Sequence, residues 1–301
     1  MNNPVVSVVT ITYNHGKYIA RAIESVLRQK LSCEFEYIIS DDNSTDDTYV
    51  ICKYYADRYP NIIKLIKSTE NVGGIANEKR SFLVAKGKYI ATCEGEDYWT
   101  DEYKLQKQLD FMEANADYSA CFHRYSKYYL RNNSFKSDGM DNLFDNKDIK
   151  GITLTDSIYL SQWTTQYLTM MFRKSCFNVE DIDKYHYYRD TVMTYLLYIT
   201  GKIFVFSFNG GVYNITGNGI YTSLSLYKRY DTEITVLKEM WNVNRDYLTK
   251  TMYLNMAQDA VFDMSNRDCN SMWLLKQSFD IFRVNHNIKR LLKNIKRVLL
   301  R

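Results

Sequence analysis

The first hundred residues alternate between short apolar runs and longer segments of helical pattern. The apolar runs are rich in β-branched residues and predict buried strands at 5–12, 37–40, 62–66 and 88–93. The segments between and after them predict helices at 17–29, 44–58, 78–85 and 103–113. Strands separated by helices of this length predict an α/β fold with a mostly parallel sheet flanked by helices. Ligands of such sheets bind beyond the carboxyl ends of the strands, here in the loops after residues 12, 40 and 93.

The second part of the chain is less regular. Residues 123–150 are polar and predict a mobile loop, which contains Asp138, Asp141, Asp145 and Asp148. Further apolar runs predict strands at 167–172 and 203–208, with a helix at 191–199 between them. Beyond about residue 225 the pattern is helical to the end. The sequence therefore predicts a sheet-containing region followed by a helical C-terminal region.

Charge changes this picture only near the end of the chain. The 301 residues carry 39 Lys and Arg against 35 Asp and Glu, a net charge of +4 that does not indicate nucleic acid as a partner. No acidic residue follows residue 282, whereas basic residues stand at 283, 289, 290, 293, 296, 297 and 301. On a helical wheel these lie opposite an apolar stripe, which predicts a basic amphipathic helix over 283–301 on an anionic membrane surface. The alternative is a docked terminal helix with a solvated basic face.

Location follows from what the sequence lacks. It has no secretory signal at its start and no uncharged apolar run near the roughly 18 residues that a membrane span needs. We therefore expect a cytoplasmic protein, with the basic helix attached peripherally to the inner face of the plasma membrane.

The three strand-end loops carry the candidate chemistry. Tyr13, after the first strand, could stack on a nucleobase, although the same segment could be a simple helix entry. Asp41 and Asp42 follow the second strand, where a carboxylate can accept the N–H of a uracil. The loop after the fourth strand places three carboxylates within four residues: Glu94, Glu96 and Asp97. Their repulsion would be relieved by Mg²⁺ or Mn²⁺ bound together with phosphate oxygens; the alternative is a solvated acidic turn.

Taken together, these loops resemble those of glycosyltransferase family 2, whose fold is the Rossmann-like GT-A fold. The resemblance covers residues 5 to about 115 and rests on the segments 7–14, 41–48, 70–74, 87–101 and 104–108 in this order. It implies that Tyr13 and Asp42 hold the base of a nucleotide-sugar donor. The nucleotide site that it implies also contains Thr12, Asn14, Asn71 and Gly73.

The resemblance also implies a metal site and a catalytic base. Glu94, Glu96 and Asp97 match the Asp-x-Asp-Asp element that binds Mn²⁺ or Mg²⁺ and the sugar diphosphate, with glutamates at the first two acidic positions. Asp190, ahead of an apolar helix, matches the general base that removes the proton of the acceptor hydroxyl. A plain helix cap is the alternative for this residue.

One segment departs from the family pattern. A Tyr-Arg-x-His-like segment often follows the strand predicted at 203–208, but here Asn214 and Thr216 replace its Arg and His. The usual contacts to the diphosphate are therefore in doubt, although backbone N–H groups of the glycine-rich segment could substitute for them.

We expect an inverting glycosyltransferase of bacterial surface-polysaccharide type. It would move a sugar from a nucleotide donor, most simply UDP-linked, to a glycan or lipid-linked glycan acceptor. Residues 1–115 would form the donor-binding half of one domain, 116–224 the acceptor-binding and catalytic half, and 225–301 the helical region. The alternative is a non-catalytic homologue that binds nucleotide sugars or glycans. A dinucleotide-dependent oxidoreductase is excluded because no G-x-G-x-x-G follows the first strand.

Overall fold

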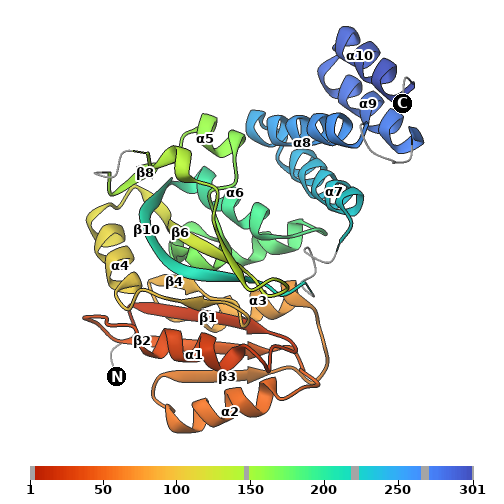
Figure 1. Ribbon diagram of the computed structural model, residues 1–301. Helices are drawn as coiled ribbons and strands as arrows, with labels where there is room; N and C mark the ends of the chain where they lie inside the picture. Colours follow the sequence, from red (N-terminus) through yellow and green to blue (C-terminus); the bar gives the residue numbers. More distant parts are fainter. Residues whose placement is uncertain (1–3, 146–148, 218–223, 266–270, 300–301) are drawn as a thin grey trace. The chain divides into compact units, whose positions relative to one another are not determined.

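The computed structural model describes residues 4–145, 149–217, 224–265 and 271–299 (Figure 1). Arg301, part of the basic segment, lies outside these ranges. The chain divides into two compact units: one comprises 1–183 and 188–217, and the other comprises 184–187 and 218–301. Each unit is described separately below.

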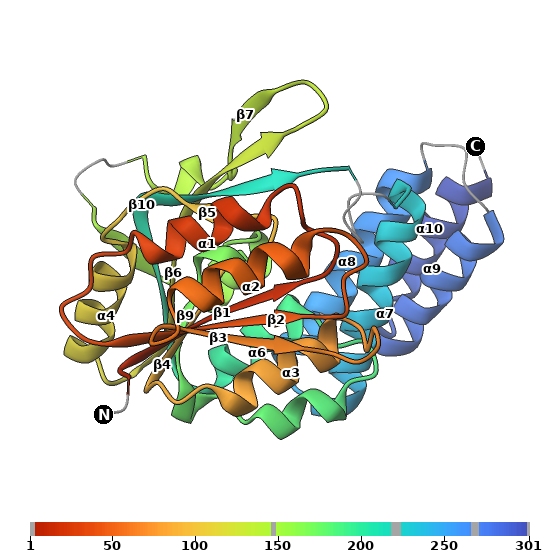
Figure 2. The same ribbon diagram turned by 90° about the horizontal axis from the view of Figure 1, so that it is seen from below.

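The first unit is built on a parallel four-stranded core. Its strands are β1 (Val6–Thr12), β2 (Phe35–Asp41), β3 (Ile63–Lys67) and β4 (Tyr89–Thr92), in the order β3-β2-β1-β4. The connecting helices are α1 (Ile19–Leu27), α2 (Thr48–Arg58) and α3 (Gly74–Val84). Helices α1 and α2 lie on one face of these strands and α3 on the other (Figure 2). The predicted α/β class is therefore confirmed.

The same sheet continues with strands of mixed direction. Strand β9 (Met171–Arg173) runs antiparallel to β4 and to β6 (Tyr118–Tyr129), while β10 (Lys202–Ile215) runs parallel to β6. Three short strands complete the described sheet: β5 (Tyr98–Trp99), β7 (Ser134–Ser137) and β8 (Gly151–Thr153). The helices of this half are α4 (Lys104–Ala114), α5 (Asp156–Ser161) and α6 (Asp190–Thr200). Strand β10 is much longer than the predicted 203–208 and reaches the loop after β4.

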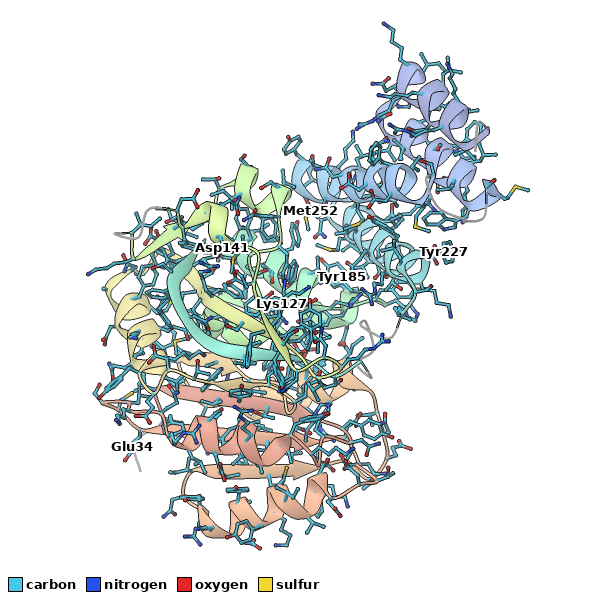
Figure 3. All side chains as sticks on the ribbon, viewed as in Figure 1. Glu34, Lys127, Asp141, Tyr185, Tyr227 and Met252 are labelled. Carbon is cyan, nitrogen blue, oxygen red and sulfur yellow. The ribbon has the colours of Figure 1, made fainter. Side chains whose placement is uncertain are left out.

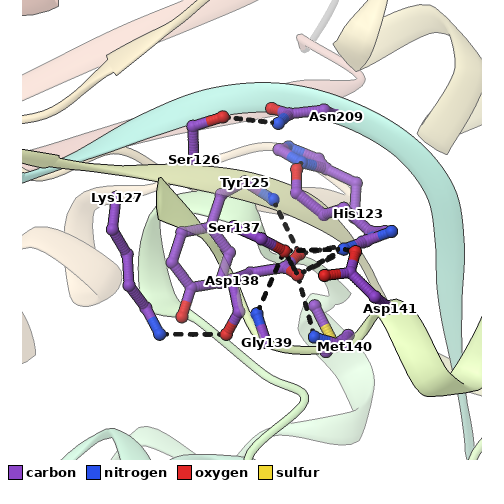
Figure 4. A network of polar contacts seen from close by, with 11 residues as sticks. His123, Tyr125, Ser126, Lys127, Ser137, Asp138, Gly139, Met140, Asp141 and Asn209 are labelled. Atoms are coloured by element: carbon purple, nitrogen blue, oxygen red, sulfur yellow. Dashed lines mark hydrogen bonds and ion pairs between the residues drawn. The ribbon is translucent and has the colours of Figure 1, made fainter. Parts of the chain in front are cut away.

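The prediction of a mobile loop over 123–150 is wrong for the described part of that segment. Strand β6 continues to Tyr129 and pairs with β7 in an antiparallel hairpin. The hairpin base is held by Asp138, whose carboxylate accepts hydrogen bonds from Arg124 Nη2 at 2.6 Å and from the backbone N–H groups of Tyr125 and Met140 (Figure 4). The side chain of Asp138 is fully buried. An acidic residue that reads as a loop position is thus part of a packed ion pair.

This ion pair leads to a prediction about stability. Asp138→Ala should lower the free energy of unfolding by about 2–4 kcal/mol, because it leaves two buried amides without an acceptor and Arg124 with only the exposed Asp141 as a carboxylate partner among the described residues. Asp141→Ala is the matched control, since Asp141 contacts the same arginine from an exposed position and should cost about 1 kcal/mol or less. Chemical denaturation measures both values. Equal losses in the two variants would contradict a structural role specific to Asp138.

Two other boundaries differ from the sequence prediction. Helix α2 begins at Thr48 rather than 44, because the Ser44 hydroxyl accepts the N–H of Asn14 and Asp46 accepts the N–H of Thr48. Residues 167–169 form a 3₁₀ turn rather than a strand. Their carbonyl groups accept hydrogen bonds from the side chains of Thr92, Trp99 and Gln108 instead of from a neighbouring strand.

The second unit is helical, as predicted. It contains α7 (Leu226–Asn244), α8 (Tyr247–Ser265), α9 (Ser271–Asn285) and α10 (Ile288–Leu299). Tyr227 on α7, labelled in Figure 3, packs edge-on against Trp273 of α9 with ring centroids 5.0 Å apart. No described helix is both long and apolar enough to cross a membrane.

The basic segment is not one continuous helix. Helix α9 ends at Asn285, and His286 has a positive φ of 54° before α10 begins. Leu291 and Val298 on the apolar stripe of α10 are 6% and 3% exposed, because α10 packs on α9 and α8. The stripe exposes Ile288 and Leu292. Part of the stripe therefore belongs to the core of this unit, and the basic side faces solvent.

Candidate active site

The loops after β1 and β2 are joined by hydrogen bonds. Asn14 has a positive φ of 56°, donates its backbone N–H to Ser44 Oγ at 2.9 Å, and accepts the Thr45 N–H on Oδ1 at 2.8 Å. Gly16 N–H donates to Asp46 Oδ2 at 2.9 Å. Asn14 thus holds the two loops together. The neighbouring Tyr13 stays 41% exposed, which leaves its ring open to stacking.

Asp42 connects the second loop to the segment before α3. Its Oδ1 accepts the Val72 N–H at 2.9 Å and its Oδ2 accepts the Gly73 N–H at 2.8 Å. Gly73 has a φ of 87°, which favours glycine, and also donates to Asn71 Oδ1 at 3.1 Å. The structure therefore brings together three of the predicted nucleotide-binding residues, Asp42, Asn71 and Gly73. Each oxygen of Asp42 retains a lone pair, but the carboxylate already serves to position this turn.

The acidic loop after β4 packs closely against the first loop. A Cβ atom at Gly95 would lie 2.6 Å from Thr12 Oγ1 and 2.7 Å from His15 Nδ1, so only glycine allows this approach. Thr12 Oγ1 and His15 Nδ1 are hydrogen-bonded at 3.1 Å, and His15 Nε2 lies 3.7 Å from Glu96 Oε2. Burial lowers the pKa of His15 to about 4, so the ring is neutral near pH 7. Thr12 thus supports the acidic loop through His15.

Two carboxylates of this loop are buried with an unused oxygen. Asp97 Oδ1 accepts the Asn214 N–H at 2.8 Å, whereas Asp97 Oδ2 and Glu94 Oε2 are buried and have no hydrogen-bond partner among the described residues. Burial, followed by the charge of Glu96, raises the pKa of Glu94, and burial followed by the charge of Glu94 raises the pKa of Asp97. Such crowding is costly unless a proton or a cation compensates it.

These residues fit a divalent cation that shares its ligands with a substrate. In the described ranges no three His, Cys, Asp or Glu side chains are arranged to enclose an ion by themselves. The two unused oxygens of Glu94 and Asp97 nevertheless offer the one or two carboxylate ligands that Mg²⁺ takes when phosphate oxygens supply the rest. Glu96 is less buried and is turned toward His15.

Asn214 has a role that the sequence did not reveal. It occupies the position where the family pattern often has Arg, near the end of β10. Its backbone N–H bonds to Asp97, and its side-chain amide donates to the carbonyl of Glu96. Asn214, which replaces the Arg of the family pattern, therefore stabilises the acidic loop through these two hydrogen bonds. Of the glycine-rich segment invoked as a substitute, Asn218 and Gly219 lie outside the described residues.

Asp190 lies at the start of α6 and faces the same region. It is the first residue of the helix, and its Oδ1 accepts the Thr191 N–H at 2.9 Å. Its charge contributes to the raised pKa of Glu94, which places the two carboxyl groups within electrostatic reach. Burial raises the pKa of Asp190 itself, and Arg189 opposes this rise. The predicted base thus lies within electrostatic reach of Glu94 in the predicted metal loop, although the two are about a hundred residues apart in sequence.

Sequence reasoning missed several groups around these carboxylates. Glu78 on α3 is 8% exposed and accepts a hydrogen bond from Tyr188 Oη at 3.3 Å, two residues before Asp190. Tyr125 on β6 and Tyr213 on β10 lie edge to face with ring centroids 6.3 Å apart. The charges of Asp97 and Asp190 act on both tyrosines. For Glu78, the sequence shows only a carboxylate within an amphipathic helix, which is typical of a surface position.

Glu78 leads to a prediction about pH. Burial, helped by the charges of Asp190 and Glu94, raises the pKa of Glu78 to about 8. The folded protein then holds a proton that the unfolded chain releases above about pH 4.5, so this group's stabilisation declines between about pH 5 and pH 8. Glu78→Gln should therefore show a smaller fall in unfolding free energy across this range than the parent protein, as measured by denaturation in EDTA.

Glu34→Gln provides the control for this experiment. Glu34 is exposed, and its replacement should leave the pH dependence of stability as in the parent protein. A Glu78→Gln variant with the same slope as Glu34→Gln would contradict a buried, protonated Glu78.

Comparisons with known proteins identify the family of this chain. The sequence model described as "Glycosyl transferase family 2" matches residues 7–180. WfaP of Escherichia coli, named as a UDP-Glc:alpha-D-GlcNAc-diphosphoundecaprenol beta-1,3-glucosyltransferase, is 35% identical over 126 residues, or 42% of this chain and 47% of WfaP. The uncharacterised protein Rv1520 of Mycobacterium tuberculosis is 42% identical over 117 residues, or 39% of this chain and 34% of that protein. The chain thus matches less than half the length of these relatives.

Solved structures share the fold. Residues 1–349 of S. aureus TarS, crystallised with UDP-GlcNAc, superpose with a TM-score of 0.69 at 18% identity, covering 97% of this chain and 90% of that one. The mannosyltransferase PcManGT from Pyrobaculum calidifontis, in complex with GDP-Man and Mn²⁺, gives a TM-score of 0.57 at 13% identity, covering 100% and 87%. The GT-A fold expected from the sequence is thereby confirmed. Because the family model spans more than half of the chain, this protein belongs to glycosyltransferase family 2.

Proposed function

We propose that this protein is an inverting glycosyltransferase that transfers a sugar from a nucleotide donor to a glycan or lipid-linked glycan in surface polysaccharide synthesis. The observation that carries the proposal is the placement of Asp190 within electrostatic reach of Glu94, in the acidic loop beyond the carboxyl end of β4. A candidate base and a diphosphate-binding loop on one sheet edge are what such a transfer requires.

We propose a UDP-linked donor held by residues 1–115. The exposed ring of Tyr13 is available to stack on a base, and Asp42, whose N–H donates to the Thr12 carbonyl, retains lone pairs on its carboxylate. Thr12, Asn14, Asn71 and Gly73 shape this site through the loop contacts described above. TarS was crystallised with UDP-GlcNAc and with UDP, and WfaP is named for UDP-Glc, which supports uridine as the base.

We further propose that Asp97 and Glu94, with Glu96 beside them, hold Mn²⁺ or Mg²⁺ together with the donor diphosphate. When bound, such an ion neutralises the charge that develops on the leaving nucleoside diphosphate. Asn214 keeps Asp97 oriented through its backbone N–H. The structure of PcManGT in complex with GDP-Man and Mn²⁺ supports this assignment.

The transfer itself would depend on Asp190. Its carboxylate takes the proton of the acceptor hydroxyl while the hydroxyl oxygen bonds to the anomeric carbon. The bond between that carbon and the donor diphosphate breaks, and the electron pair leaves with the nucleoside diphosphate. Attack from the face opposite the leaving group inverts the anomeric configuration. The hydrogen bond from the Thr191 N–H fixes one oxygen of Asp190 for this step.

The acceptor would be bound by residues 116–224, which contain Asp190, Tyr125 and Tyr213. WfaP is named for an acceptor linked to diphosphoundecaprenol, which supports a lipid-linked glycan. Such an acceptor would place the protein in the cytoplasm at the inner face of the plasma membrane. The solvent-facing basic side of α10, within the segment 283–301, would then meet the anionic surface.

A thermal-shift screen of nucleotide sugars with and without Mn²⁺, followed by turnover of the stabilising donor, tests this function. Metal-dependent release of the nucleoside diphosphate would support the enzyme. Glu94, Glu96 and Asn214 depart from the family pattern and favour a second candidate, a non-catalytic nucleotide-sugar-binding homologue. Donor binding without any turnover would favour that candidate and refute the enzyme.

A further inference from the structure

The second unit contains a hollow of about 340 Å³ between α8 and α10. This volume lies within the range of about 300–1,000 Å³ that is typical of ligand pockets. Four of its lining residues are cationic: Lys289, Arg290, Lys293 and Arg297. The other three are amides: Gln258, Asn287 and Asn294. We call this hollow the α10 pocket; it belongs wholly to the second unit and is separate from the candidate active site in sequence.

The floor of the α10 pocket is fixed by buried polar contacts. The side-chain amides of Gln258 and Asn294 exchange two hydrogen bonds at 3.1 and 3.2 Å, and Asn294 is only 1% exposed. Asn287 Oδ1 accepts the Arg290 N–H at 2.9 Å, which fixes the first turn of α10. The Arg297 guanidinium lies 4.4 Å from the Phe262 ring centroid. The pocket is therefore built on the helix packing and does not consist of surface lysines alone.

The four cations of the α10 pocket are not neutralised by ion pairs within the described residues. All the described lining residues are basic or neutral, and their four cations form no ion pair within the described chain. The charge of Arg290 opposes the rise in the pKa of Asp259 on α8 that burial causes, but the two residues form no ion pair. Four cations around one hollow repel one another, so an anion bound there gains from all of them. Two of the four are arginines, whose planar forks bind phosphate oxygens in pairs.

We propose that the α10 pocket binds the phosphate group of an anionic ligand. The ligand is recognised by charge and by the forked donors of Arg290 and Arg297, with the amide floor supplying further hydrogen-bond groups. Two sources share this chemistry: the headgroup of an anionic phospholipid, and a soluble phosphate or diphosphate. The proposal does not depend on the transfer reaction, because binding of the phosphate ligand is measured in the absence of a sugar donor.

The partial burial of the apolar stripe favours phosphate recognition over insertion into a bilayer. Leu291 and Val298 pack inside the unit, so α10 offers a membrane its basic side together with the exposed Ile288 and Leu292. A helix held in this way meets a surface through headgroups and not through acyl chains.

The experiment compares two charge-matched double variants of the full chain. Arg290→Gln/Lys293→Gln removes two cations from the pocket, whereas Lys276→Gln/Lys296→Gln removes two exposed cations of α9 and α10 outside it. Binding is measured by co-sedimentation with phosphatidylglycerol–phosphatidylcholine vesicles, with pure phosphatidylcholine vesicles as the blank. Calorimetry with inorganic pyrophosphate in EDTA forms the second arm. The active site is unchanged in both variants, so any contribution it makes cancels in the comparison.

The pocket variant should lose at least tenfold in affinity in one arm or both, and the control variant less than threefold. Loss with vesicles alone identifies a lipid headgroup, and loss with pyrophosphate alone identifies a soluble phosphate. Equal weakening of both variants would show a diffuse surface charge and overturn the proposal, as would the absence of binding in both arms. If thermal unfolding shows the pocket variant to be destabilised, Lys293→Gln against Lys296→Gln gives the same comparison with one charge each.

Discussion

Asp190→Asn should lower the rate of sugar transfer by about 10²–10⁴-fold and leave donor binding unchanged. The amide cannot take the proton of the acceptor hydroxyl, but its oxygen can still accept the Thr191 N–H, so the start of α6 keeps its geometry. Transfer is measured as formation of glycosylated acceptor, and donor binding by calorimetry. In the parent protein the rate should rise with pH as Asp190 loses its proton, and this rise should disappear in the variant.

Asp110→Asn is the matched control for this substitution. Asp110 is an exposed carboxylate on α4 of the same unit, and its replacement should change neither rate nor binding. A near-normal rate of transfer in Asp190→Asn would contradict the assignment of Asp190 as the general base. Loss of donor binding together with transfer would instead indicate that Asp190 acts through the structure of the site.

Asp97→Asn should reduce metal-dependent turnover by about 10²-fold or more, because metal ions stabilise transition-state charge by several kcal/mol. The change keeps an oxygen for the Asn214 N–H and removes the negative charge beside the unused Oδ2. Binding of Mn²⁺ in the presence of UDP, followed by electron paramagnetic resonance, should weaken in parallel. The expected effect of this variant is therefore on the ion and the diphosphate together.

Glu96→Gln provides an internal comparison. Glu96 is less buried than Asp97 and lies beside His15, so its loss should weaken Mn²⁺ binding less than Asp97→Asn does. An equal or larger effect of Glu96→Gln would contradict the ranking of ligands proposed here. A protein that turns over its donor equally well in EDTA would contradict the metal assignment as a whole.

The parallel core and the loops of the site could be predicted because they depend on local sequence. The β-branched runs correctly predicted β1 to β4, and the loops after them contain Tyr13, Asp42 and Asp97 as expected. The convergence of Asp190 with the acidic loop followed only from the family resemblance, since about a hundred residues separate them. Glu78 could not be predicted, because its burial results from tertiary packing against Tyr188 and not from its own helix.

The errors have the same physical origin. The polar pattern of residues 123–150 predicts a loop, but the buried Asp138 forms an ion pair with the half-buried Arg124 at the base of the hairpin. The sequence predicts one helix over 283–301 because its apolar and basic residues keep a regular helical spacing. In the structure, the positive φ of His286 divides this segment. Single-residue backbone conformations and distant ion-pair partners leave little trace in periodicity.

The hydrogen bonds from Asn214 to the acidic loop have a consequence for modularity. Rv1520 and WfaP resemble this chain over 117 and 126 residues, a length that corresponds to the donor-binding part alone. Yet the orientation of Asp97 is set from β10, more than a hundred residues further along the chain. In a chimaera that takes residues 1–115 from a relative, the acidic loop of the relative would therefore contact the β10 of this protein, to which it is not adapted. Engineering a new donor preference would succeed more readily when the end of β10 is exchanged together with residues 1–115.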